Sequence, residues 1–142
     1  MSDLAEIDKV RRLEELNLQL PQRDLRTAMF AHAGMGVRTI FVQKGTTITG
    51  ALTKIANVCI VSGDITVTTD EGPKRFTGYH VLPAVAGFKR AGYAHEDTWW
   101  TTIWKTDETE ACAMEDEMTD EADMLQTRRA GIVYEQPPEL ED

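Results

Sequence analysis

Short runs of β-branched and aromatic residues, separated by turn-forming residues, fill the middle of the sequence. Connecting segments such as "KG", "SGD" and "DEGP" contain the Gly, Pro and Asp that tight turns require. No helical periodicity interrupts the runs. Many short strands at this spacing predict an antiparallel β-sandwich or barrel between residues 22 and 106. The expected strands cover residues 37–43, 47–54, 57–61, 64–69, 74–76, 79–82, 87–92 and 98–104.

Helical patterns flank this β region on both sides. Residues 1–21 predict an amphipathic helix that packs either on its own domain or against a neighbouring subunit, with Leu4 and Ile7 as interface candidates. Residues 107–130 predict an acidic helix whose Met114 and Met118 fill a core or an interface. Residues 131–142 are Pro-rich and acidic, and we expect an extended tail that orders only against a partner. The expected fold is therefore mainly β, with one helix at each end.

Composition excludes several classes of function. A formal net charge of −9 disfavours nucleic acid and anionic membranes as partners, because both attract Lys-rich and Arg-rich surfaces. No apolar run approaches the roughly 20 residues that span a bilayer, and the acidic start lacks the pattern of a signal peptide. Cys59 and Cys112 form neither a disulfide framework nor a CxxC metal motif. We expect a protein of the cytoplasm with reduced thiols.

The segment "GTTITGALTKIANVCIVSGDITV" resembles the first motif of the cupins, small jelly-roll β-barrels. Aligning that motif on Gly45 places Ala51 and Thr53 where the cupin histidines stand and Asn57 near the glutamate. The later segment "GYHVLPAVAGFKRAGY" resembles the second motif, with Arg90 in place of its histidine. The turn glycines match, whereas the metal ligands do not. The resemblance implies a cupin-like antiparallel jelly-roll barrel.

The substituted ligand positions predict a barrel without a metal or other cofactor. Ala and Thr cannot replace imidazole, and a protonated Arg repels a divalent cation. An unrelated metal site built from His80 with His95, Glu96 or Asp97 stays an alternative. Acid–base catalysis by Tyr79 and His80 would need both side chains on one face, but neighbouring strand residues point to opposite faces. We therefore expect no catalytic residues and no enzymatic activity.

A second resemblance covers more of the chain, from about residue 30 to residue 129. The barrel segments followed by "TDEAD" and an arginine pair are similar to a family of small cupin-like proteins encoded by tailed bacteriophages and prophages. That family has no assigned activity. The resemblance implies a phage origin and a metal-free barrel. We expect a protein of such an origin to be synthesised in the host cytoplasm, with the virion as a second location. The N-terminal helix and the Pro-rich tail have no counterpart in the family pattern.

Three functions follow from these observations. The first is an oligomeric structural or assembly component of a phage particle, in which a decoration, tail or head-to-tail role would use Trp99, Trp100 and Trp104 at interfaces between copies or with other phage proteins. The second is a binding module for a small anion, a nucleotide or a host factor, with ligand-binding candidates Arg90, Lys89, Lys54 and His80. In that case a structural ion pair of Arg90 with Glu96 or Asp97 is the alternative role. The third is a cupin-type isomerase or oxygenase.

Overall fold

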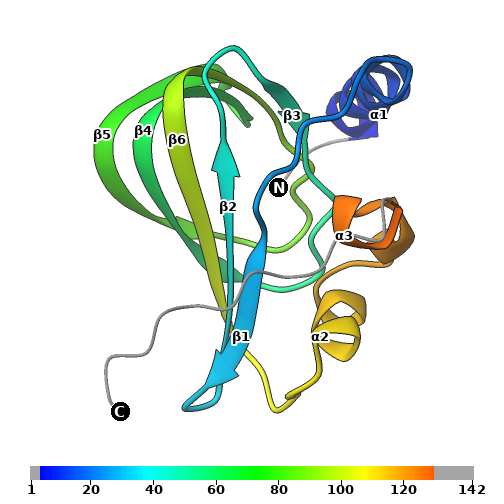
Figure 1. Cartoon of the computed structure of the whole chain (residues 1–142), viewed down its shortest axis with the longest axis vertical. Helices are drawn as coiled ribbons and strands as arrows, with labels where there is room; N and C mark the ends of the chain where they lie inside the picture. The colour runs from blue at the N-terminus through cyan, green and yellow to red at the C-terminus, as the bar shows by residue number, and fades with distance from the viewer. Residues whose placement is uncertain (1–3, 130–142) are drawn as a thin grey trace.

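The computed structural model describes residues 4–129, which form one curled β-sheet with helices along its open side (Figure 1). Helix α1 (Leu4–Leu18) precedes the sheet. The strands are β1 (Ala28–His32), β2 (Met35–Val42), β3 (Thr47–Thr49), β4 (Asn57–Thr69), β5 (Gly72–Ala84) and β6 (Ala91–Lys105). Three short helical elements follow the sheet: α2 (Ala111–Met118), the 3-10 turn η1 (Ala122–Met124) and α3 (Gln126–Arg129). This arrangement confirms the prediction of a mainly β fold with helices at both ends.

All strand pairs are antiparallel, in the order β1-β2-β6-β4-β5. Strand β3 pairs with the first residues of β6, where Thr47 lies opposite Tyr93. The long strand β6 therefore joins β2 and β3 on one side to β4 on the other. Its curvature brings the two ends of the sheet around a common interior (Figure 1).

Side chains alternate between the interior and the outside of the curl. Val61, Trp100 and Ile40 are partners across three strands and face inward, where Val61 is fully buried. Trp104 also faces inward and packs with Met29 and Met114, so that α2 closes one end of the sheet. The core therefore lies between the concave face of the sheet and the C-terminal helices.

The strands are fewer and longer than the sequence predicts. The "SGD" segment is not a turn: β4 runs through it with a bulge between Ser62 and Asp64. Gly63 has φ +148° and lies opposite Gly78, which has φ +87°. Since a bulge bends a strand without ending it, two expected strands merge into β4 and two more into β5. Because of this bend, β4 and β5 each continue through the curved part of the sheet as one long strand.

The ends of other expected elements also differ. Strand β1 was not expected, β3 ends at Thr49, and the expected strand 87–92 contributes only its last residues to β6. The predicted helix 107–130 is interrupted after Met118, because Thr119 is extended and its hydroxyl accepts a hydrogen bond from the Glu121 N–H at 3.0 Å. Thr119 forms an isolated bridge with Thr53. Residues 131–142 lie outside the described part of the chain.

Candidate functional site

A cavity of about 160 Å³ lies inside the curled sheet, beneath α2. The positions that the cupin pattern assigns to metal ligands all line it: Ala51, Thr53, Asn57 and Arg90. They come from the segment after β3, the start of β4 and the segment before β6. The sequence alignment therefore identified residues that the fold does bring together. We call this space the inner cavity.

The side chains at these positions do not fit a metal ion. Thr53 Oγ1 donates a hydrogen bond to the Phe88 carbonyl at 3.3 Å, and Asn57 Nδ2 donates one to the Ile55 carbonyl at 3.1 Å. Ala51 offers no donor atom, and Arg90 is a cation. Transition-metal sites in proteins need imidazole, thiolate or carboxylate ligands. Within residues 4–129, no group of three or more His, Cys, Asp and Glu side chains could hold a metal ion.

Arg90 is the half-buried cation of the inner cavity. Its Nη1 donates a hydrogen bond to the Thr68 carbonyl at 3.0 Å, and its guanidinium lies 4.1 Å from the centre of the Phe88 ring. Burial lowers the pKa of Arg90, an effect that attraction to Cys59 and Asp70 opposes. Such a group keeps its charge at neutral pH. A desolvated guanidinium of this kind is suited to binding an anion.

The prediction of an ion pair between Arg90 and Glu96 or Asp97 is wrong. Glu96 pairs with Lys44 at 3.5 Å, and Asp97 Oδ1 accepts a hydrogen bond from the Lys44 N–H at 2.9 Å. Both carboxylates lie near the turn that follows β2. The contacts of Arg90 are instead a backbone carbonyl and an aromatic ring.

Three further polar groups line the inner cavity. The Cys59 thiol donates to Asn57 Oδ1 at 3.3 Å, and burial raises its pKa, although Arg90 opposes this rise. Glu115 is only 2% exposed and is held by Thr127 at 2.8 Å and Arg128 at 3.1 Å. Arg38 faces the same interior from β2. The sequence analysis missed Arg38, although a charged residue alternating with Ile40 and Val42 is a detectable pattern for an inward-facing cation.

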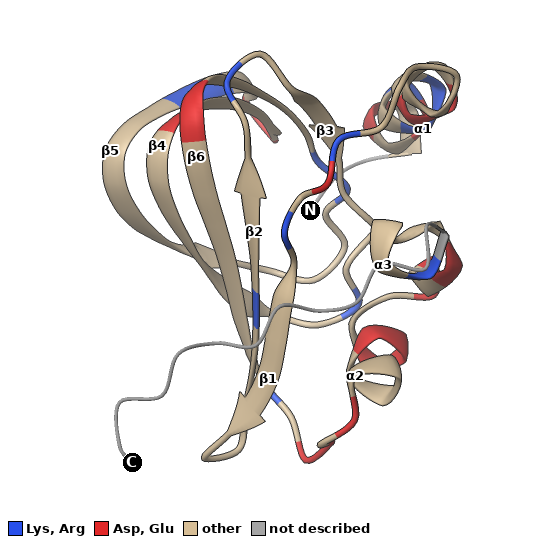
Figure 2. Ribbon diagram, viewed as in Figure 1, with Lys and Arg blue, Asp and Glu red and all other residues tan. Residues whose placement is uncertain are grey.

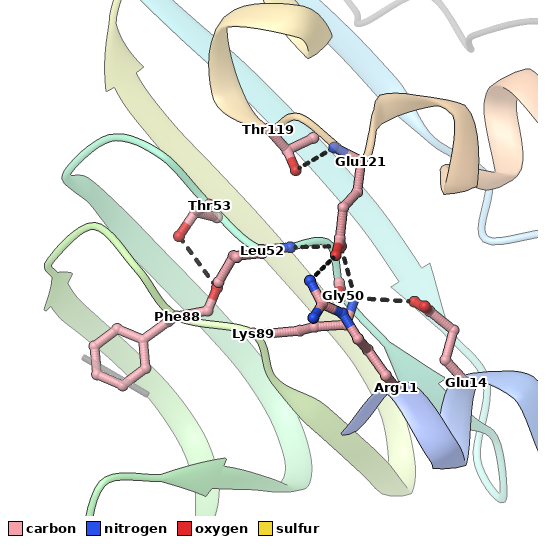
Figure 3. Close-up of polar contacts among 9 residues, drawn as sticks. All are labelled: Arg11, Glu14, Gly50, Leu52, Thr53, Phe88, Lys89, Thr119 and Glu121. Carbon is pink, nitrogen blue, oxygen red and sulfur yellow. Dashed lines mark hydrogen bonds and ion pairs between the residues drawn. The ribbon is translucent and has the colours of Figure 1, made fainter. Parts of the chain in front are cut away.

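Lys89 lies outside this cavity, in a second polar cluster (Figure 3). Its side chain is fully buried, and its ammonium lies 2.8 Å from Glu121 and 3.1 Å from Glu14, and donates to the Gly50 carbonyl at 2.9 Å. Arg11 also reaches Glu121, at 2.9 Å. We call Arg11, Glu14, Lys89 and Glu121 the charge cluster. It joins α1 to the segments before β6 and after α2, so Lys89 connects parts of the chain and does not face the barrel mouth.

The other expected ligand-binding residues are dispersed. Lys54 pairs with Asp120 at 2.8 Å on the surface. His80 Nε2 lies 2.9 Å from the Thr77 carbonyl, and its ring meets the edge of Phe76 on β5. Tyr79, its neighbour, is 67% exposed. Only Arg90 of the four candidates therefore lies in the inner cavity.

The outward positions of the sheet form a continuous uncharged surface. Its members pair across the strands in rows, so that Val58, Ile103 and Val37 are neighbours, as are Ser62, Trp99 and Phe41. In Figure 2 the acidic residues of β4 and β6 lie near the top of the view, where these strands bend, and the lengths of β4, β5 and β6 directly below them are uncharged. We call this surface the outer face; it comprises Phe30, Val37, Thr39, Phe41, Val58, Ile60, Ser62, Tyr79, Val81, Trp99, Thr101 and Ile103.

The three tryptophans have different surroundings. Trp99 is 41% exposed on the outer face, stacks on Phe41 with ring centroids 4.8 Å apart, and lies beneath Arg26. Trp100 faces the inner cavity, which confirms that the two neighbours point to opposite faces. Trp104 is buried under α2 and donates to Glu117 at 3.1 Å.

The remaining interface candidates divide in the same way. Ile7 and Met114 are buried within the chain, and Met118 lines the inner cavity. Leu4 is 77% exposed at the start of α1. Trp99 and Leu4 are thus the expected interface residues with substantial exposure.

Comparisons with known proteins give structural similarity only. No family model matches the chain, and no curated protein matches it. A conserved Streptococcus pyogenes protein of unknown function is 24% identical, with a TM-score of 0.42 over 56% of this chain and 70% of its own. A cupin-2 domain containing protein from Shewanella frigidimarina is 12% identical, with a TM-score of 0.46 over 64% of this chain and 90% of its own. A cupin 2 conserved barrel domain protein from Leptotrichia buccalis is 11% identical, with a TM-score of 0.48 over 70% of this chain and 50% of its own.

Proposed function

We propose that this chain is a non-enzymatic, metal-free protein that self-associates through the outer face and serves as a structural or assembly component. The observation that carries this proposal is the uncharged surface that extends over β1, β2, β6, β4 and β5. Large exposed apolar patches on soluble proteins mark interaction sites. Its most exposed apolar members are Tyr79 at 67%, Val81 at 54% and Trp99 at 41%.

A second copy of the chain is the partner that this surface fits best. The surface's own residues carry no charge, although the Arg26 guanidinium lies over Phe41 and Trp99, and in a two-fold dimer an uncharged face meets its own copy. Strands about 4.8 Å apart, with a rise of about 3.3 Å per residue, give five strands of five residues an area on the order of 400 Å². Two such faces approach the roughly 1,000 Å² that a specific interface buries.

The test is the subunit count of the full chain by native mass spectrometry, with light scattering across a dilution series. Val81→Glu places a carboxylate on the outer face, and we expect it to weaken self-association about 100-fold because the charge is desolvated without a partner. Leu16→Glu is the matched control, since Leu16 is 60% exposed on α1, which packs on the open side of the sheet and not on the outer face (Figure 1). A monomeric wild-type chain, or dissociation by Leu16→Glu alone, would overturn the proposal.

A place in a phage particle is the finer part of this proposal. Its support is the sequence resemblance of residues 30–129 to a phage family, together with a surface suited to repeated contacts. Peptide mass spectrometry of purified particles tests it, and we expect the chain in stoichiometric amounts with the major structural proteins. Its absence from particles would leave a self-associating protein without a virion role. Among the described helices, none has both the length and the apolar character needed to cross a bilayer.

A further inference from the structure

The inner cavity adjoins a second, outer cavity of about 270 Å³ at the end of the β4–β5 hairpin. Asp70, Glu71 and Lys74 lie in the wall of the outer cavity, beside Phe76 and Pro83. The shared walls show that the two spaces are adjacent compartments. The residues common to both are Cys59, Val67, Ala84, Phe88, Arg90 and Trp100.

Arg90 stands at this boundary with unused hydrogen-bonding capacity. A guanidinium has five N–H donors, and the Arg90 contacts within residues 4–129 are one hydrogen bond to the Thr68 carbonyl and the face of Phe88. Asp70 attracts Arg90 electrostatically, but no carboxylate of the described chain forms an ion pair with it. The remaining donors match the two oxygens of a carboxylate, which Arg binds with two parallel hydrogen bonds.

Beyond Arg90 the inner cavity is largely apolar and small. Ile40, Ile48, Trp100 and Met118 contribute side chains to its wall. An engineered protein cavity of about 150 Å³ holds one benzene molecule, so about 160 Å³ has room for a body of similar size. Removing such a body from water is favourable by about 25 cal/mol per Å² of apolar surface.

We propose that the inner cavity binds a small apolar monocarboxylate, with its carboxylate on Arg90 and its apolar body beside Ile40, Trp100 and Met118. This site does not depend on self-association, because its wall comes from the concave side of the sheet. It also narrows the broader expectation of an anion site, since a nucleotide is much larger than this cavity.

The surroundings of Arg90 favour a ligand with one charged group. In the outer wall, Asp70 and Glu71 stand beside the single cation Lys74 and disfavour a second anionic group that would extend beyond Arg90. On the inner side, Arg38 adds a second cation, and Glu115 already engages Thr127 and Arg128. Most of the remaining wall is apolar, so a further anionic group would lose its hydration there, whereas a monocarboxylate places its only charge on the guanidinium.

The first experiment is calorimetric titration of the full chain with isocaproate and with isocaproamide, its uncharged counterpart of nearly the same shape. We expect isocaproate to bind at least tenfold more tightly at neutral pH, because only the acid gains the charge-assisted hydrogen bonds. Equal affinity for acid and amide, or no binding of either, would overturn the proposal. Tighter binding of inorganic phosphate would overturn the assignment to monocarboxylates.

Arg90→Met then tests the anchoring group, since methionine retains part of the apolar stem without the charge. We expect this variant to lose the preference for acid over amide. Arg12→Met removes one charge from the exposed side of α1 and should keep that preference. If Arg90→Met retained it, the guanidinium would not be the anchor.

A measurement on the wild-type chain covers the case in which Arg90→Met does not fold. Cys59 is buried between the two cavities and Cys112 is exposed, so maleimide labelling of Cys112 serves as an internal reference. We expect isocaproate to slow the labelling of Cys59 severalfold without changing that of Cys112, and phosphate to leave both unchanged. Unaltered Cys59 labelling at saturating isocaproate would contradict the proposed site.

Discussion

The ammonium of Lys89 lies 2.8 Å from Glu121 Oε2, although the side chain of Lys89 is fully buried. Glu121 also accepts hydrogen bonds from Arg11 at 2.9 Å and from the Leu52 N–H at 3.0 Å. One carboxylate thereby joins α1, the segment after β3 and the segment before β6. The interruption of the predicted C-terminal helix is what frees Glu121 to reach them.

Replacing Lys89 with methionine should strongly destabilise the fold. The change leaves Glu14 and Glu121 near each other without the ammonium between them, and removing one partner of a buried ion pair costs about 3 to 5 kcal/mol. Urea denaturation followed by circular dichroism measures the loss. Lys9→Met is the control, because Lys9 pairs with Glu6 on the exposed side of α1 and should change stability little.

The double variant Lys89→Met with Glu121→Gln separates this pair from general packing. Removing both charges avoids an uncompensated carboxylate, so the double variant should be less destabilised than the sum of the two single variants. Strictly additive losses would show that Lys89 and Glu121 are not energetically coupled.

Acid should weaken the charge cluster. Burial alone would raise the pKa of Glu121, but hydrogen bonds from Lys89, Leu52 and Arg11 outweigh this effect and lower it to about 2. Because the folded pKa lies below the unfolded value of 4.5, the stabilisation is complete above pH 4.5 and is lost as the pH falls toward 2. Urea midpoints of the wild type and Glu121→Gln, measured between pH 6 and pH 2.5, should converge with decreasing pH. A constant difference would contradict the lowered pKa.

Gly63 should tolerate substitution much less than its partner Gly78. A Cβ at Gly63 would lie 2.4 Å from Thr98 Oγ1 and 2.6 Å from the Asp97 carbonyl oxygen, whereas a Cβ at Gly78 meets no atom within 4 Å. Both residues have positive φ. Gly78→Ala should therefore cost about 1 kcal/mol for backbone strain alone, and Gly63→Ala roughly 3 kcal/mol because β4 and β6 must also separate. Equal losses in thermal denaturation would mean that the bulge can shift.

Much of the fold could be predicted because its information is local. The apolar spacing of residues 4–18 specifies a helix, and the β-branched runs of β4 and β6 specify β structure, although they leave the ends of these strands open. Gly63 was misleading because the same residue serves a turn and a bulge, and its role depends on Thr98, which is distant in the sequence. The C-terminal helix pattern failed at Thr119 because tertiary contacts of Thr119 and Glu121 outweigh helix propensity.

The candidate site was predictable in part, because the spacing of its residues along the sequence is also local information. The cupin spacing identified Ala51, Thr53, Asn57 and Arg90, which share the inner cavity. Lys89 could not be distinguished from Arg90 by sequence, since adjacent residues point in different directions and the carboxylates of Glu14 and Glu121 are remote in the chain. The outer face could not be predicted, because its residues follow from the strand register. The sequence divides β4 and β5 into shorter strands and so does not give that register.

Alanine variants of Trp99 and Trp104 should affect self-association and folding stability differently. Trp104 is 2% exposed and packs against Met29 and Met114, so Trp104→Ala should lower the free energy of unfolding by about 3 to 5 kcal/mol. Trp99 is 41% exposed and contacts mainly Phe41 and Arg26, so Trp99→Ala should change the stability of the isolated subunit much less. At a self-associating outer face, however, a central tryptophan contributes about 2 kcal/mol, and its loss should weaken the dimer roughly 30-fold. Urea denaturation and light scattering on both variants measure the two effects. A Trp99→Ala variant that unfolds more easily yet associates normally would show that Trp99 stabilises the subunit and does not contribute to the interface.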